Sequence, residues 1–96
     1  MMIIREYKYN YQRKGGGISV KAFILIETAV GKTKQVCTAL QKLKAIKSVD
    51  AVTGPYDVII TVEGEDPNAI GIIVSGQIHS IPGINRTVTC LTLQIR

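Results

Sequence analysis

The sequence predicts an α+β domain in which a four-stranded antiparallel sheet carries two helices on one face. Apolar residues alternate with period two in four segments, which is typical of strands. Two segments with apolar residues at helical spacing lie between the first and second strands and between the third and fourth. A Gly-Pro turn joins the two middle strands. This order, strand-helix-strand twice over, is the ferredoxin-like βαββαβ arrangement.

The first half of the domain is expected to contain a strand, a helix and a second strand. Residues 20–27 are apolar on both faces and form the first strand. After Gly31 the apolar period becomes helical, and most lysines of this segment fall outside the apolar stripe. The second strand is expected over residues 49–53. The predicted helical stripe consists of Val36, Leu40, Leu43 and Ile46.

The second half repeats the pattern. The third strand is expected over residues 57–63, directly after the turn. Asp66 followed by Pro67 predicts the start of a helix, because an acidic cap before a proline at the first helical position is favoured there. Pro82-Gly83 ends this helix, and the last strand is expected over residues 86–95. The apolar stripe of this helix consists of Ile70, Ile73, Val74 and Ile78.

The sheet is predicted to bury both of its faces. The helices cover one face only, yet the first, third and fourth strands are apolar on both. The simplest cover for the second face is the same face of another copy, related by a two-fold axis. We therefore expect a homodimer.

Residues 1–17 are predicted to form a strand-like arm in front of a domain that spans residues 18–96. Tyr7, Tyr9 and Tyr11 lie on one side of the alternation, and three glycines end the arm as a hinge. Because an isolated strand is not stable in water, the arm is expected to pack against another element.

Composition excludes several classes of protein. The chain has 96 residues, of which 46% are hydrophobic, as expected for one folded domain. No apolar run reaches the roughly 20 residues of a membrane span, and no signal sequence is visible, which predicts a cytoplasmic protein. The net charge is +5, but residues 20–96 carry eight bases against six acids. This near balance predicts no direct DNA binding.

Catalytic and metal-binding patterns are absent from the sequence, so no enzyme, cofactor or metal is predicted. Cys37 and Cys90 lack the spacing of metal ligands and are expected to be reduced, buried and inert. His79 stands alone and is expected to be structural.

The turn between the middle strands is the candidate ligand site. An amino acid needs an anion for its ammonium group and free N–H groups for its carboxylate. Asp57 supplies the anion, the backbone at Gly54 is open to a ligand, and Tyr56 forms a wall. Thr87 and Thr89 of the last strand are candidates from a neighbouring subunit. The alternative is that Asp57 caps its own turn and the threonines only favour a strand.

From Val20 onward, the chain resembles the effector-binding domain of the Lrp/AsnC (feast/famine) transcription regulators. The resemblance rests on an apolar first strand, on the turn from Gly54 to Asp57 and on the segments 81–84 and 87–89. It implies a dimeric α/β barrel, further assembly of dimers into rings, and amino acids bound between dimers near the turn. It also implies that Gly54, Tyr56 and Asp57 are ligand-binding residues, with Thr87 and Thr89 in second rank.

Members of that family carry a helix-turn-helix domain before this module. About 19 residues precede Val20 here, too few for three helices, so a stand-alone RAM (regulation of amino acid metabolism) module is expected. The expected function is amino-acid sensing and oligomerisation, with a full-length regulator of the family as a possible partner. The alternative is a small cofactor-free enzyme of the dimeric α/β barrel type, a monooxygenase or an isomerase. A third option is a nucleic-acid binder that acts through the basic arm, with an affinity that falls steeply with salt.

Overall fold

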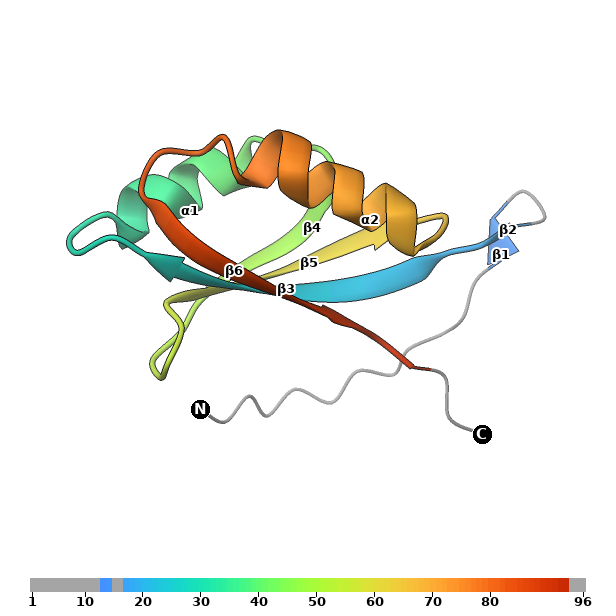
Figure 1. Cartoon of the computed structure of the whole chain (residues 1–96), viewed down its shortest axis with the longest axis horizontal. Coiled ribbons are helices and arrows are strands. Elements are labelled where there is room, and N and C mark those ends of the chain that lie inside the picture. Colours follow the sequence, from blue (N-terminus) through green and yellow to red (C-terminus); the bar gives the residue numbers. More distant parts are fainter. Residues whose placement is uncertain (1–12, 15–16, 94–96) are drawn as a thin grey trace.

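A computed structural model of the chain describes residues 13–14 and 17–93. Its main sheet is antiparallel with the strand order β4-β5-β3-β6, and both helices lie on one face of this sheet (Figure 1). The predicted ferredoxin-like fold is therefore confirmed. The elements are β1 (Arg13–Lys14), β2 (Gly17–Ile18), β3 (Val20–Thr28), α1 (Thr33–Gln41), β4 (Ile46–Ala51), β5 (Val58–Gly64), α2 (Pro67–Ile73), the π-helical turn η1 (Val74–Ile78) and β6 (Ile84–Leu91).

Three predicted boundaries were wrong. The second strand was expected over 49–53, whereas β4 begins at Ile46 and ends at Ala51. Ile46 was expected in the first helix, but α1 ends at Gln41 and Ile46 begins β4, where it pairs with Val62. The residues from 42 to 45 all favour helices and include neither glycine nor proline, so the sequence contains no signal for the end of α1. The last strand was expected over 86–95, whereas β6 begins at Ile84 and ends at Leu91.

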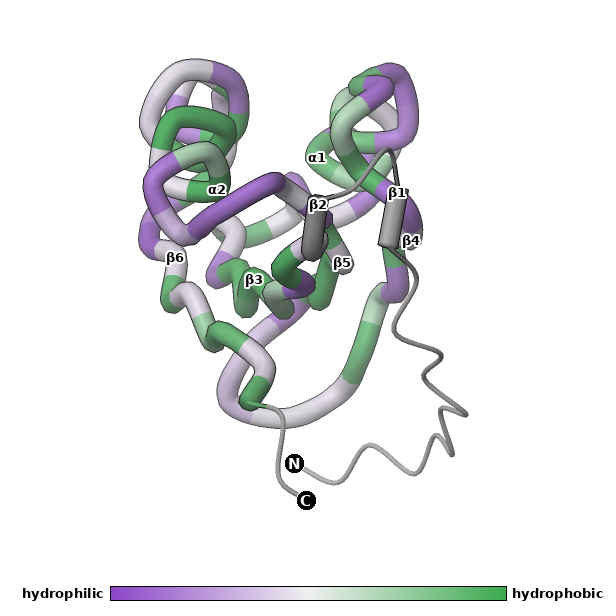
Figure 2. The backbone as a smooth tube through the Cα atoms, turned by 90° about the vertical axis from the view of Figure 1, so that its right-hand side faces the viewer, coloured by the Kyte–Doolittle hydropathy of each residue, from purple (hydrophilic) through white to green (hydrophobic). Residues whose placement is uncertain are grey.

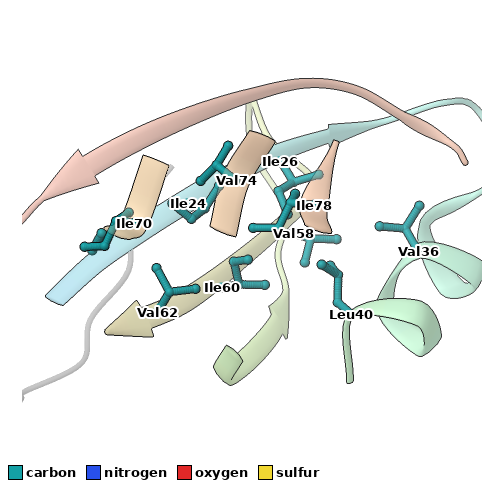
Figure 3. Close-up of a cluster of buried hydrophobic side chains, with 11 residues drawn as sticks. Ile24, Ile26, Val36, Leu40, Val58, Ile60, Val62, Ile70, Val74 and Ile78 are labelled. Atoms are coloured by element: carbon teal, nitrogen blue, oxygen red, sulfur yellow. The ribbon is translucent and has the colours of Figure 1, made fainter. Parts of the chain in front are cut away.

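The hydrophobic core lies between the sheet and the helices (Figure 3). Isoleucine and valine side chains of β3 and β5 point at the apolar stripes of α1, α2 and η1. Each fully buried side chain of this size contributes about 1.5–3 kcal/mol relative to an exposed one. The buried core residues are Ala22, Ile24, Ile26, Val36, Leu40, Val58, Ile60, Val62, Ile70, Val74 and Ile78.

The other face of the sheet is also apolar, as the sequence predicts. Residues paired directly across an antiparallel sheet point to the same face, and Leu25 pairs with both Ile59 and Val88. Phe23 pairs in the same way with Cys90. Ile59 is buried, but Phe23 and Leu25 are half-buried and Val88 is exposed, and no helix between residues 17 and 93 covers them. Below, this set of five residues is called the open sheet face.

The cysteines differ from the expectation. Both are free, but Cys37 on α1 is half-buried and Cys90 on β6 is exposed, so the prediction of two buried thiols was wrong. Cys90 belongs to the open sheet face. The alternation of the strand places its side chain on that face, where it is buried only if a second layer covers the sheet. Burial raises the pKa of the Cys37 thiol.

The N-terminal arm falls almost entirely outside the described residues. Within the part that the structure does describe, β1 and β2 pair antiparallel, Arg13 with Ile18 and Lys14 with Gly17. The boundary at residue 17 and the packing of the tyrosines stay predictions.

Candidate functional site

The turn over residues 52–57 connects β4 to β5 and projects from the side of the sheet opposite the helices (Figure 1). Two backbone hydrogen bonds hold its base. Val52 N–H donates to the carbonyl oxygen of Asp57 at 2.9 Å, and Asp57 N–H donates to that of Ile26 at 2.9 Å. Gly54 has a φ of 141°, a conformation that side chains rarely adopt. The glycine is therefore required by the backbone of the turn.

The carboxylate of Asp57 is held by the neighbouring strand. Its Oδ2 accepts a hydrogen bond from the backbone N–H of Thr28 at 2.8 Å. The register of β3 with β6 shifts between Glu27 and Thr28, so this N–H lies where the regular ladder is interrupted. A hydrogen bond to a charged group contributes about 1.5–3 kcal/mol. Asp57 thus fastens the turn to the end of β3 instead of capping its own turn.

An aromatic ring and two opposite charges lie beside the turn. The guanidinium carbon of Arg86 lies 5.8 Å from the centre of the Tyr56 ring. Arg86 Nη2 lies 3.8 Å from Glu27 Oε2, and the two side chains are 63% and 40% exposed. That distance is too long for a hydrogen bond, and an exposed pair of this kind contributes little to stability. Both charged groups are therefore available to a ligand at little cost.

Sequence reasoning missed Glu27 and Arg86. Glu27 of β3 pairs directly with Arg86 of β6. The two strands are neighbours in the sheet but lie far apart in the sequence. The available signal is their opposite charge at the ends of two predicted strands. Using it requires the register of β3 with β6, which the sequence pattern does not determine.

Within one chain, Thr87 and Thr89 do not lie with the charged and aromatic residues at the turn. Thr87 pairs with Ile26 and Thr89 with Ile24, and both isoleucines belong to the core, so the threonines point to the helix side of the sheet. The hydroxyl of Thr87 lies 2.9 Å from Nε2 of His79, at the end of η1. Arg86, one residue earlier, points to the opposite side.

Histidine and cysteine make no further constellation here. His79 joins the end of the second helical segment to β6 through Thr87, which is a structural contact. Among the described residues, no group of three or more His, Cys, Asp or Glu side chains is placed to hold a metal ion. None of the described helices is long and apolar enough to cross a membrane.

Comparison with known families identifies the domain. The family model described as the Lrp/AsnC ligand binding domain matches residues 21–95, from the start of β3 to beyond β6. The chain belongs to this family. The resemblance seen in the sequence is confirmed.

Individual relatives of this Lrp/AsnC domain agree. The HTH-type transcriptional regulator FL11 of Pyrococcus abyssi is 30% identical over 92 residues, which are 96% of this chain and 60% of FL11. The chain thus spans about 60% of the length of this curated relative. The crystal structure of FFRP-DM1 matches with a TM-score of 0.72 and 32% identity, over 77% of this chain and 99% of that one.

A more distant structure shares the fold alone. The transcriptional regulator NMB0573 of Neisseria meningitidis, solved as a complex with L-Met, matches with a TM-score of 0.76 and 19% identity. The match covers 95% of this chain and 60% of that protein. In the present Lrp/AsnC domain, Tyr56 and Asp57 of the turn lie together with Glu27 and Arg86 of the adjacent strands. An aromatic ring and charges of both signs thus meet at one end of the sheet.

Proposed function

We propose that this Lrp/AsnC ligand-binding domain senses a free amino acid at the turn over residues 52–57. The observation that carries the proposal is the joint placement of two carboxylates, a guanidinium and an aromatic ring around one turn. A zwitterion offers a partner to each charge. The L-Met complex of the Neisseria regulator, which shares the fold, supports a ligand of this class.

The residues take distinct roles in this proposal. Asp57 and Glu27 accept hydrogen bonds from the ammonium group, while Arg86 donates to the carboxylate. The open backbone at Gly54 contributes N–H groups, because no side chain shields it. Tyr56 flanks the bound amino acid with its ring. The Glu27–Arg86 pair opens on binding, and each partner exchanges a weak contact at 3.8 Å for a closer one with the ligand.

Assembly completes the site. The open sheet face is proposed to pair with the same face of a second copy, which buries Phe23, Leu25 and Val88. Thr87 and Thr89 then contribute to a turn of another subunit in a higher oligomer. Within one chain these threonines lie on the opposite side of the sheet from Arg86.

The domain is proposed to act by binding and assembly in the cytoplasm and not as an enzyme. Its curated relative FL11 is a transcriptional regulator, and His79, the one histidine of the chain, is bonded to Thr87. A full-length regulator of the Lrp/AsnC family is the proposed protein partner, because the same fold then forms both halves of the interface.

A thermal-shift screen of the twenty amino acids tests the proposal. A ligand at one hundred times its Kd stabilises the folded state by about 2.7 kcal/mol. For a domain of this size, that stabilisation raises Tm by about 10 °C or more. We expect at least one amino acid to give such a shift, and a screen in which none does contradicts the sensing function.

Two variants assign the site. Asp57→Asn keeps the acceptor for Thr28 N–H but removes the charge, so the protein should fold as before and bind the amino acid at least about tenfold more weakly. Arg86→Gln should weaken binding through the ligand carboxylate. Lys34→Gln is the matched control, since Lys34 lies on α1 and should leave amino-acid affinity unchanged. If both site variants bind the amino acid as tightly as the parent, the binding site does not lie at this turn.

A further inference from the structure

The five lysines around α1 form a positive surface with no acidic residue among them. Glu27 and Asp50 are the acids that flank this part of the sequence, and between them the chain carries only basic charges. One lysine lies on α1 itself, one precedes it and three follow it. They are Lys32, Lys34, Lys42, Lys44 and Lys47, and all five are exposed.

The rest of the described domain has the opposite sign. Apart from these lysines, residues 17–93 carry two bases, Lys21 and Arg86, against six acids. Three of the acids, Glu63, Glu65 and Asp66, are at the junction of β5 and α2. The small net charge of the domain therefore hides a separation of charge, with the positive part concentrated at α1.

The described part of the domain offers these lysines no acidic partner. None of the five makes an ion pair with a described residue, whereas Arg86 pairs with Glu27. The exposed positions between Lys34 and Lys42 are polar and uncharged, namely Gln35, Thr38 and Gln41. Amide and hydroxyl side chains of this kind commonly contact phosphate oxygens beside lysine.

The apolar side of α1 is not available to a partner. Val36 and Leu40 are fully buried in the core, so α1 has no free apolar face with which to enter a lipid surface. Within the described part of α1, no large hydrophobic side chain is exposed; Val30, in the preceding turn, is the nearest in sequence that is. A partner is thus recognised here by charge and hydrogen bonding.

We propose that α1 with its flanking lysines binds the phosphate backbone of duplex DNA without sequence preference. The eight-residue step from Lys34 to Lys42 is about 12 Å along a helix. Phosphates of one DNA strand rise by about 3.4 Å each along the duplex axis, so the step between the two lysines equals the axial rise of three to four phosphates. This surface does not involve the amino-acid site, and it opposes the expectation of no direct DNA binding, which rested on net charge alone.

Fluorescence anisotropy with a labelled DNA duplex of mixed sequence tests the proposal at increasing salt. Each phosphate contact contributes about −0.9 to the slope of log K against log salt concentration. The triple variant Lys34→Gln/Lys42→Gln/Lys44→Gln removes three contacts, so its slope should be smaller by about 2.7. Between 50 and 200 mM salt, its affinity should then fall by about 40-fold less than that of the parent.

A matched control removes the same charge from the arm. Lys8→Gln/Arg13→Gln/Lys14→Gln should keep the slope of the parent, and both triple variants should keep its melting temperature. The proposal is overturned if the parent does not bind the duplex at 50 mM salt. It is also overturned if the salt dependence of DNA binding becomes weaker in the arm variant but stays that of the parent in the α1 variant. Binding to vesicles of anionic lipid without binding to DNA would also exclude it.

Discussion

Asp57 illustrates how one carboxylate serves both the fold and the proposed ligand. Its Oδ2 accepts from Thr28 N–H, which leaves its negative charge at the surface of the turn. Asp57→Ala should therefore lower the free energy of unfolding by about 1.5–3 kcal/mol, while Asp57→Asn lowers it less because the amide oxygen still accepts the bond. Urea denaturation in the absence of amino acids measures the difference. Equal losses in the two variants would show that the bond to Thr28 contributes nothing.

Gly54 is the second residue whose chemistry is determined by the turn. Its φ of 141° is strained for any residue with a Cβ atom. Gly54→Ala should destabilise the protein by about 1–3 kcal/mol and weaken amino-acid binding, because the new methyl group also shields the backbone N–H groups. The melting temperature and the ligand-induced shift measure the two effects separately. A variant as stable as the parent would show that the turn has another conformation in solution.

At this scale, sequence alone identified three of the five residues that form the candidate site within one chain. Gly54, Tyr56 and Asp57 lie within four consecutive residues, so local reasoning found them. Glu27 and Arg86 meet only through the pairing of β3 with β6, and that register lies beyond a local pattern. The same limit applies to Thr87, since only its pairing with Ile26 reveals the face to which it points.

Among the elements, the end of α1 shows where tertiary pairing overrides local propensity. The segment from Lys42 to Ala45 favours a helix by composition. Ile46 nevertheless pairs with Val62, where its β-branched side chain packs against the core. The N-terminal cap of α2 was predictable because Asp66 makes a local contact, its Oδ1 accepting from Ala69 N–H at 2.8 Å.

The second helix offers a simple test of element stability. Gly71 lies within α2, is exposed, and has open space where a Cβ atom would lie. Because its φ is not in the positive range, Gly71→Ala should stabilise the protein by up to about 1 kcal/mol, opposite in sign to the effect at Gly54. The midpoint of urea denaturation measures it. A destabilised variant would indicate that another subunit contacts α2 closely at Gly71.

For the whole molecule, the open sheet face is the proposed interface between two copies. Val88 and Val30 are both exposed valines, at 36% and 101%, but only Val88 belongs to the open sheet face. Val88→Glu should convert the dimer to a monomer at about micromolar concentration, because it places a charge in the interface, whereas Val30→Glu should not. Sedimentation velocity measures the species present. Equal behaviour of the two variants would place the interface elsewhere.

The cysteines report on the same assembly. Cys90 is exposed in a single chain, while burial raises the pKa of the Cys37 thiol and so lowers its thiolate fraction at pH 8. In the Val88→Glu monomer, Cys90 should react faster than Cys37 with a disulfide reagent. In the parent dimer, Cys90 should be protected as well. Rapid labelling of Cys90 in an intact dimer would contradict pairing through the open sheet face.

The sequence pattern correctly predicted two apolar faces on the sheet, because successive side chains of a strand point to opposite faces. It did not reveal the separation of charge, since counting bases and acids over residues 20–96 averages α1 with the acids beyond it. Position in the fold, not the total, determines what a charged surface attracts.

The short contacts at the end of β3 connect the proposed amino-acid site to α1. Thr28 donates its N–H to Asp57, and its hydroxyl lies 2.8 Å from that of Thr33, the first residue of α1. An amino acid that draws Asp57 away from Thr28 therefore acts on Thr33, the first residue of α1. Figure 2 shows how α1 lies above β4 and β5. Such coupling is reciprocal at equilibrium, so duplex DNA must then change the affinity for the amino acid by the same factor by which the amino acid changes the affinity for DNA. Titrating the amino acid with and without the duplex should give that common factor, and Thr28→Val, which removes the hydroxyl, should bring it close to one.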